Sequence, residues 1–225
     1  MNARPTLLDV FAGCGGMTRG FKDAGFDPIF AVEFDRAAAA TYAANFGDHI
    51  HAGDIADVSP EQIPPVDVMV GGPPCQGFSA LGLRNVDDPR NDLWREYLRF
   101  VGTAHPKVFV LENVQRFRRS PQHQMLLDEA QGGSLQEYTL TSAVVVASDY
   151  GVAQKRPRTI VIGSRIGRID VPAPTHSREP GLGTVRWEGV RSRIEPLMDT
   201  PTRAELPSAT PSRSPARSAR SPPHG

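Results

Sequence analysis

The residue best suited to chemistry in this sequence is Cys75, which lies in the stretch Gly71-Gly72-Pro73-Pro74-Cys75-Gln76-Gly77-Phe78-Ser79. An apolar run at 66–70 precedes it, so we expect a buried strand to deliver the thiol to the rim of a sheet, where open α/β sheets bind ligands. Two prolines fix φ in the loop, and a thiolate presented there can act as a nucleophile. The alternative is an inert buried cysteine, because free cysteine packs like a small hydrophobe.

Other groups that favour the chemical interpretation accompany two later expected strands. Glu112 comes directly after the apolar run 107–111, which places an acid at the same sheet edge as the thiol. A group of cations precedes the strand expected at 159–163, namely Lys155, Arg156 and Arg158. Such cations often form only a solvated surface, but opposite a cysteine and an acid they suit a clamp on an anionic or electron-rich substrate.

The chain opens with the features of a nucleotide-binding unit. A short apolar strand is expected at 6–11, and the glycine-rich turn at 12–16 leads into a helix, as in Rossmann-like folds. A dinucleotide fingerprint would need its third glycine at the position of Thr18, so that ligand class is disfavoured. The turn is therefore either another kind of ligand loop or a tight structural turn. We expect Cys14 within it to pack structurally.

Acids follow the next two expected strands. Glu33 ends the run 28–32 and is placed to accept hydrogen bonds from ribose hydroxyls, and the alternative is a solvated acid that caps the helix expected at 36–46. Asp54 follows a third short strand, where it can accept from an exocyclic amine while Ile55 covers an adenine face. A simple turn aspartate is the competing interpretation.

Apolar spacing defines the remaining elements. Residues 91–101 carry apolar side chains at three- and four-residue intervals, which predicts a helix whose stripe faces the core. Residues 121–132 suggest another helix. A long β stretch at 135–147, rich in Thr and Val, is expected to pair with 159–163 as a hairpin.

Composition indicates one main domain. With 225 residues, of which 39% are hydrophobic and 22% charged, the chain can bury one full core. Its two cysteines form no disulfide framework, and the sequence has no signal-peptide or membrane-span pattern, so we expect a soluble protein in a reducing, cytoplasmic compartment.

Charge is unevenly distributed along the chain. Residues 1–100 carry 8 basic and 14 acidic side chains, whereas residues 101–225 carry 17 basic and 11 acidic ones. We therefore expect a polyanion to bind the second half.

In chain order, these segments resemble the DNA (cytosine-5)-methyltransferase family. The resemblance rests on DVFAGCGGMTRGF, AVEFD, GDI, GGPPCQGFS, LENV and QKRPRTIVIG, within residues 6–165. It implies an α/β class I methyltransferase fold, Rossmann-like, with helices on both faces of the sheet and an antiparallel last strand pair. It also implies S-adenosyl-L-methionine as cofactor, double-stranded DNA as partner, and methyl transfer to carbon 5 of cytosine in a bacterial modification or restriction-modification context.

Residue roles are implied by the same resemblance. A nucleophile attacks carbon 6 of a flipped base, an acid binds ring nitrogen 3, and arginines orient the base; these catalytic residues are Cys75, Glu112, Arg156 and Arg158. Cofactor contacts are implied for Phe11, Gly13, Gly15, Glu33, Asp54, Ile55, Pro74 and Leu93. Substrate contacts are implied for Gln76, Ser79, Asn113 and Gln154. No metal is implied.

The C-terminal part departs from the family pattern. We expect a catalytic domain at 1–170, a connector at 171–199 that leads towards a recognition domain absent from this sequence, and a disordered tail at 200–225 with 6 prolines, 5 serines and 4 arginines. We expect no strands or helices in 171–225. Three hypotheses follow: a DNA cytosine-5 methyltransferase, an RNA cytosine-5 methyltransferase, and a truncated or split methyltransferase half that needs a second chain to supply the recognition domain.

Overall fold

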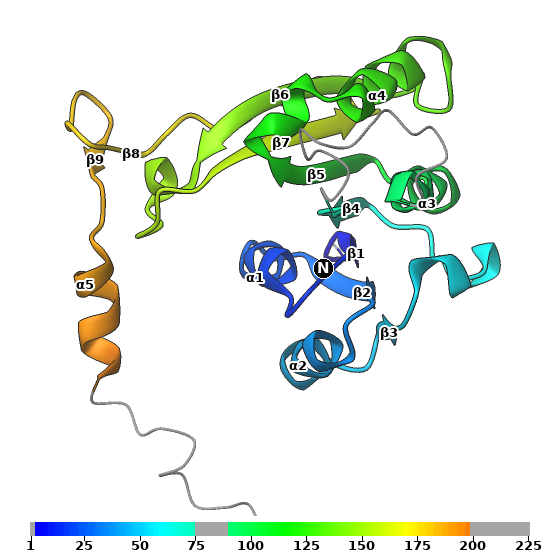
Figure 1. The fold of residues 1–225 in the computed structure, drawn as a ribbon, viewed down its shortest axis with the longest axis horizontal. Coiled ribbons are helices and arrows are strands. Elements are labelled where there is room, and N and C mark those ends of the chain that lie inside the picture. The colour runs from blue at the N-terminus through cyan, green and yellow to red at the C-terminus, as the bar shows by residue number, and fades with distance from the viewer. Residues whose placement is uncertain (1–2, 75–89, 199–225) are drawn as a thin grey trace, which may run out of the picture.

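The computed structural model describes residues 3–74 and 90–198. Strands and helices alternate along most of this length (Figure 1). The main elements are β1 (Thr6–Val10), α1 (Gly16–Asp23), β2 (Asp27–Glu33), α2 (Arg36–Phe46), β3 (Ile50–Ala52), β4 (Val68–Gly71), α3 (Arg90–Ala104), β5 (Val108–Val114), α4 (Pro121–Gly132), β6 (Thr139–Val146) and β7 (Pro157–Ser164).

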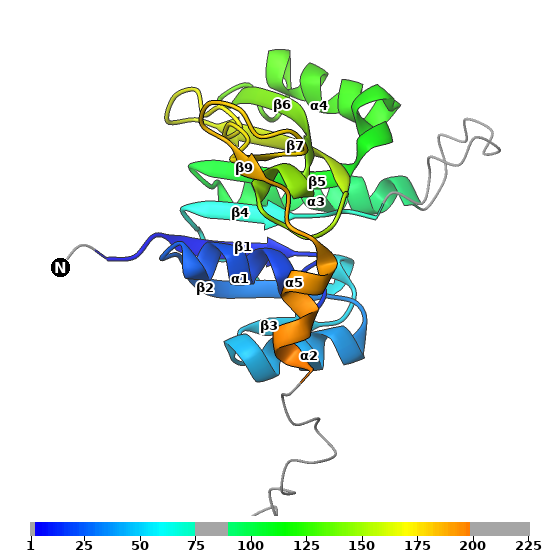
Figure 2. The same cartoon turned by 90° about the vertical axis from the view of Figure 1, so that its left-hand side faces the viewer.

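Seven strands form one sheet in the order β3-β2-β1-β4-β5-β7-β6, which Figure 2 shows from one end of the stack to the other. The first five strands in this order run parallel to one another, whereas β7 is antiparallel to both β5 and β6. The structure thus confirms the predicted α/β class and the predicted antiparallel last pair.

Helices cover both faces of the sheet, with α1 and α2 on one side and α3 and α4 on the other (Figure 1). The larger apolar core lies under α3 and α4, where the predicted stripe of α3 contributes the buried Trp94, Tyr97 and Val101. On the opposite face Tyr42 of α2 is fully buried in a smaller cluster with Ala12, which follows β1, and Ala31 of β2. The helices expected at 91–101 and 121–132 are therefore confirmed, and the first has the predicted inward face.

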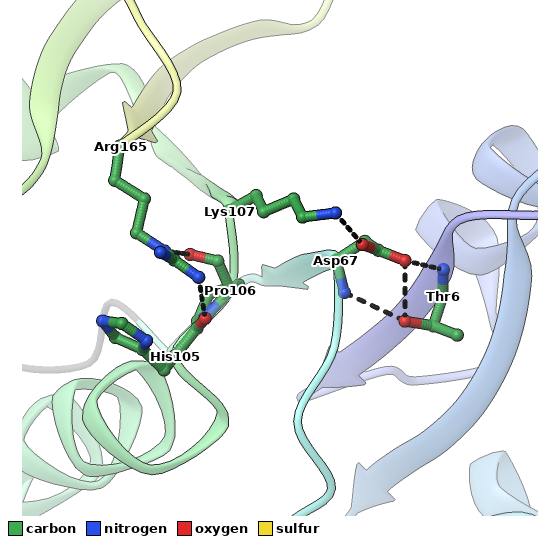
Figure 3. Close-up of polar contacts among 6 residues, drawn as sticks. All are labelled: Thr6, Asp67, His105, Pro106, Lys107 and Arg165. Atoms are coloured by element: carbon green, nitrogen blue, oxygen red, sulfur yellow. Dashed lines mark hydrogen bonds and ion pairs between the residues drawn. The ribbon is translucent and has the colours of Figure 1, made fainter.

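A polar hub joins the strands at the sheet edge where β1, β4 and β5 begin and β7 ends (Figure 3); it consists of Thr6, Asp67, His105, Pro106, Lys107 and Arg165. Asp67, just before β4, accepts hydrogen bonds from the main-chain N–H of Thr6 at 2.8 Å and its hydroxyl at 3.1 Å, and Lys107 donates to the other carboxylate oxygen at 2.7 Å. These bonds, with that from Lys107 the largest, hold the pKa of Asp67 below its usual value. Arg165, after β7, donates to the carbonyls of Pro106 and His105, both at 3.0 Å. The hub fixes the alignment of β1, β4, β5 and β7.

Two strand boundaries differ from the prediction. The strand expected at 107–111 continues to Val114, because pairing with β7 extends its ladder of hydrogen bonds through Glu112 and Asn113. The β stretch expected from residue 135 begins only at 139, and Leu135 and Tyr138 instead pack into the larger core from the preceding loop.

The expectation that 171–225 would contain no strands or helices was wrong for its first part. β8 (His176–Ser177) pairs in parallel with β9 (Val185–Arg186), and α5 (Val190–Ile194) follows. Trp187 attaches this segment to the body of the protein by donating to Asp149 at 2.9 Å. Figure 1 shows α5 standing apart from the sheet. The tail expected at 200–225 lies outside the described residues.

Candidate active site

The carboxyl ends of β1, β2, β4 and β5 lie at one edge of the sheet. Val10 near the end of β1 pairs with Val32 of β2 and with Gly71 of β4, and Gly71 in turn pairs with Leu111 of β5. Residues that follow these positions therefore gather at a common edge, opposite the polar hub. This edge of a parallel sheet is where ligands bind in open α/β folds.

The glycine-rich turn after β1 is held by contacts on both sides. Phe11 has a positive φ of 60° and packs against the larger core. Gly15 has a φ of 88°, and a Cβ there would overlap the ring of Phe46 and lie 3.0 Å from Tyr42. Only glycine combines a positive φ with the absence of a Cβ at this position. Gly15 therefore lets the main chain of the turn pack directly against the rings of α2. Cys14 is exposed, so our expectation that it packs structurally was wrong.

Glu33 joins the end of β2 to the glycine turn. Its two carboxylate oxygens accept from the main-chain N–H of Gly13 at 2.7 Å and of Asp35 at 2.8 Å. The cap of α2 is instead Asp35, which accepts from Ala38 at 2.8 Å. The alternative in which Glu33 caps that helix is therefore not what the structure shows. Each oxygen of a carboxylate can accept more than one hydrogen bond, so Glu33 retains capacity for hydroxyl donors.

An exposed aromatic ring beside Glu33 was missed by the sequence reasoning. Phe34 is 73% exposed, although phenylalanine usually lies in the interior. An aromatic ring at a strand tip next to a carboxylate can stack on a base while the carboxylate binds a sugar. The signal in the sequence was an aromatic residue between two acids, Glu33 and Asp35, directly after an apolar run.

Asp54 and Ile55 lie at the end of β3 in a short 3₁₀ turn. One oxygen of Asp54 accepts from the N–H of Ala56 at 3.0 Å, which is the contact of a turn aspartate. Ile55 is only 3% exposed and belongs to the larger core. Its carbonyl accepts from Arg99 of α3 at 2.9 Å. The predicted adenine contacts of these two residues stay predictions.

Glu112 and Arg158 form the central pair of the site. Val114 of β5 is opposite Arg158 of β7, so Arg158 lies diagonal to Glu112 on the same face of the strand pair. Its Nε lies 2.8 Å from Oε1 of Glu112, and both side chains are partly buried. A partly exposed ion pair contributes only about 1 kcal/mol or less, so its main effect is to fix the position of the carboxylate.

The loop that leads to Cys75 starts beside this pair. A Cβ at Gly72 would lie 3.3 Å from Oε2 of Glu112, a tight contact, so a side chain at this position would press against the carboxylate. Asn113, buried next to Glu112, donates its amide to the carbonyl of Pro73 at 2.9 Å. The predicted substrate residue Asn113 therefore anchors the loop. Cys75, Gln76 and Ser79 lie outside the described residues.

The other predicted site residues are spread around this edge. Pro74 is exposed, and Leu93 is half-buried against the larger core. Gln154 and Arg156 are both exposed in the connection between β6 and β7. Of the two arginines predicted to be catalytic, only Arg158 has a contact with Glu112 in the described part of the chain.

A buried carboxyl group under the glycine turn was also missed. Asp9 of β1 is fully buried, and its Oδ2 accepts from the hydroxyl of Thr18 at 2.6 Å and from its N–H at 3.2 Å. Thr18 in turn contacts the Tyr42 hydroxyl at 3.3 Å, which lies 3.2 Å from Nε2 of His49. Burial raises the pKa of Asp9 to about 7, against the lowering effect of the Thr18 hydrogen bonds. The sequence signal was one acid in an otherwise apolar strand.

Comparison with known proteins identifies the family. A family model described as C-5 cytosine-specific DNA methylase matches residues 6–196, and the chain belongs to that family. The chain is 36% identical over 189 residues to Type II methyltransferase M1.HphI of Haemophilus parahaemolyticus. The matched region covers 79% of this chain and 51% of that protein. The chain is also 36% identical to Type II methyltransferase M.AquIA of a Picosynechococcus species, with 76% of each chain covered.

A solved structure agrees with the fold. The S. pombe Dnmt2 methyltransferase superposes with a TM-score of 0.62 at 20% identity, over 75% of this chain and 54% of that one. The chain spans about half the length of the first curated relatives it matches. Within the described ranges, no helix is long and apolar enough to cross a membrane, and no cluster of three or more metal-ligating side chains occurs.

Members of this family use S-adenosylmethionine as methyl donor, and the described residues fit such a ligand. The fit rests on the open space at Gly13, where a Cβ would meet no atom within 4 Å, on the carboxylate of Glu33 with its remaining acceptor capacity, and on the exposed ring of Phe34 beside it. A carboxylate and an aromatic face suit a ribose and an adenine.

Proposed function

We propose that this chain carries the catalytic centre of a DNA cytosine-5 methyltransferase, which methylates carbon 5 of cytosine through a covalent adduct between Cys75 and carbon 6 of a flipped base. The Glu112–Arg158 pair is the observation that carries the proposal, because it lies beside Gly72 at the start of the Cys75 loop. The Type II methyltransferase relatives support a bacterial modification or restriction-modification context.

The cofactor side of the site is formed by the strand ends of β1, β2 and β3. S-adenosylmethionine, when bound, supplies an electrophilic methyl group on a sulfonium sulfur. The residues that would hold it are Phe11, Gly13, Gly15, Glu33, Asp54, Ile55, Pro74 and Leu93. Glu33 would accept from the ribose while its bond to Gly13 keeps the glycine turn at a fixed distance from β2.

Cytosine needs covalent activation because its carbon 5 is a poor nucleophile. The Cys75 thiolate adds to carbon 6, and the displaced electron pair makes carbon 5 nucleophilic, which splits one hard step into two easier ones. Methyl transfer would leave the cofactor's sulfur as a neutral thioether, after which loss of the carbon 5 proton to a water molecule and departure of the thiolate restore the aromatic ring. The thiolate is the reactive form, and cations such as Arg156 near the loop would favour it.

Glu112 acts on the opposite edge of the base. Its carboxyl group would bind ring nitrogen 3 and give it a proton as charge develops during thiolate addition. Arg158 holds Oε1 of Glu112 at 2.8 Å, so Oε2, on the Gly72 side, is the oxygen placed towards the Cys75 loop. Gln76, Ser79, Asn113 and Gln154 are the proposed substrate contacts, with Asn113 acting through Pro73.

Covalent trapping tests the nucleophile. Duplex DNA that carries 5-fluorocytosine, incubated with cofactor and with the recognition domain of a complete relative supplied as a second polypeptide, should form a denaturation-resistant adduct with the wild-type chain and none with Cys75→Ser. Cys14→Ser is the matched control, because Cys14 is the other cysteine and is exposed, and it should still form the adduct. Calorimetric titration should give Cys75→Ser the same cofactor affinity as wild type. An adduct with Cys75→Ser would mean that Cys75 is not the nucleophile.

Transfer of a labelled methyl group tests how much of the activity this chain has alone. Since the chain spans about half of its relatives, we propose that residues 1–225 transfer little and that a polypeptide supplying a recognition domain restores the rate. Site-specific turnover of duplex DNA by residues 1–225 at the rate of a complete relative contradicts that dependence. Preferential labelling of RNA over duplex DNA would replace the DNA proposal with the RNA one.

A further inference from the structure

Three arginines gather on the short turn that follows β5. This turn, η3 (Gln115–Arg119), carries Arg116, Arg118 and Arg119, and all three side chains are exposed. Within residues 3–74 and 90–198, none of the three has an ion pair with an acidic side chain. The turn begins three residues after Glu112, so its charge lies next to the proposed catalytic centre.

The turn is a fixed platform. Phe117, between the arginines, is fully buried, and its ring lies 5.5 Å from that of Trp94 and 5.6 Å from that of His123. The carbonyl of Gln115 accepts from the hydroxyl of Thr159 on β7 at 3.2 Å. With its aromatic residue in the core and its start attached to β7, η3 presents its cations from a defined position, which limits the entropy lost when they bind.

More positive charge comes from β7 to the same place. Val114 of β5 is opposite Arg158 of β7. Beyond this pair, the segment after β5 continues to Arg116, and the segment before β7 contains Arg156, so both lie at the same edge of the sheet. Arg156 and Lys155 are exposed as well. Arg118 lies close enough to His123 for its charge to add to burial in lowering the pKa of that histidine.

At the opposite edge of the sheet, the cationic side chains of the polar hub have hydrogen-bond partners within the protein. There Lys107 is paired with Asp67 at 2.7 Å, and Arg165 donates to two carbonyls (Figure 3). The η3 arginines have no such partners among the described residues. Arginine is well suited to bind phosphate because its planar guanidinium donates two parallel hydrogen bonds.

We propose that Arg116, Arg118 and Arg119 bind successive backbone phosphates of the DNA strand that carries the target cytosine, and so hold that strand against the edge where Glu112 receives the flipped base. This inference rests on the proposed function for its substrate. Phosphate contacts fix the register of a duplex and carry no sequence information, so η3 would act in every target context.

Salt dependence of DNA binding tests the three arginines. Each phosphate contact contributes about 0.9 to the slope of log affinity against log salt for duplex DNA, so Arg116→Gln/Arg118→Gln/Arg119→Gln should lower the slope by about 2.7 and Arg118→Gln alone by about 0.9. Binding should be measured by fluorescence anisotropy with a labelled duplex from 20 to about 200 mM salt, a range in which such terms are resolved.

A charge-matched control separates local contacts from overall charge. Arg4→Gln/Arg19→Gln/Arg168→Gln removes the same number of positive charges at exposed positions outside the proposed site, and it should keep the wild-type slope. A wild-type slope in the η3 triple variant, or an equal loss in the control, overturns the assignment. If the wild-type chain does not bind duplex DNA at low salt, the proposed function itself is contradicted. If it binds and the η3 triple variant keeps the wild-type slope, only the assignment of the arginines is contradicted.

Discussion

Replacement of Asp9 by asparagine should remove a pH-dependent loss of stability. Asp9 is fully buried in β1, and its Oδ1 has no hydrogen-bond partner among the described residues, so its charged form is poorly stabilised. Asparagine has nearly the same shape, and its amide oxygen can accept the two Thr18 bonds that Oδ2 now accepts. The substitution therefore changes ionisation more than packing.

The sign and size follow from the two pKa values. The pKa of Asp9 is about 7 in the folded protein against an ordinary value of 3.8, so between these values the folded state binds more protons and stability falls as pH rises. Each pH unit in this window costs about 1.4 kcal/mol. From pH 5 to pH 8 the wild-type chain should lose about 3 kcal/mol at most relative to Asp9→Asn, since the loss stops above the folded pKa.

Other titrating groups do not disturb the comparison. Burial lowers the pKa values of His49 and His123, so their contribution has the opposite sign, with stability rising as pH approaches the ordinary histidine value. Both histidines are present in wild type and variant. Their contributions therefore cancel when the free energy of unfolding of one protein is subtracted from that of the other.

Urea unfolding at half-unit intervals from pH 5 to pH 8.5 measures this difference. The free energy of unfolding of Asp9→Asn minus that of wild type should rise with pH and level off near pH 7. Asp23→Asn, at an exposed position on α1, is the control and should give a difference that does not change over this range. Parallel curves for wild type and Asp9→Asn would mean that Asp9 is charged in the fold throughout and would refute the reasoning.

Two further substitutions test the cofactor edge and the core. Glu33→Ala should weaken S-adenosylmethionine binding about ten- to a hundredfold in calorimetric titration, because a charge-assisted hydrogen bond is worth roughly 1.5–3 kcal/mol; an unchanged dissociation constant would remove Glu33 from the cofactor site. Gly163→Ala should cost roughly 1–3 kcal/mol in urea unfolding, since the new Cβ would overlap the buried ring of Phe109. Gly132→Ala, where a Cβ meets no atom within 4 Å, is its control, and equal midpoints for the two variants would contradict the steric argument.

The sheet was predictable because each of its strands is marked locally. Apolar runs ending in Glu33 or in the Gly71–Pro74 stretch identify both a strand and the edge at which it ends. The antiparallel hairpin was predictable for the same reason, since two consecutive β-rich runs are joined by a short polar segment.

Contacts between distant segments could not be predicted in this way. The chain of hydrogen bonds from Asp9 to Tyr42 depends on how α1 and α2 lie on the sheet, and no local pattern encodes that. The bond from Asn113 to Pro73 likewise joins residues whose neighbourhood exists only after β4 and β5 pair. The exposure of Cys14 could not be predicted either, because a small residue among glycines carries no local signal of burial.

The place of β7 between β5 and β6 also determines when the active site can form during synthesis. Glu112 is synthesised as part of β5, before β6 and β7. Its partner Arg158 is synthesised only with β7, the last strand of the sheet in sequence order. Until then β5 is an edge strand that pairs with β4 on one side and has unpaired main-chain groups on the other, the kind of surface that templates aggregation. We expect amide protection of β5 to appear only together with that of β7 in pulse-labelled refolding. A chain that ends before residue 157 would therefore have an open β5 edge and should aggregate more readily than the chain that contains β7.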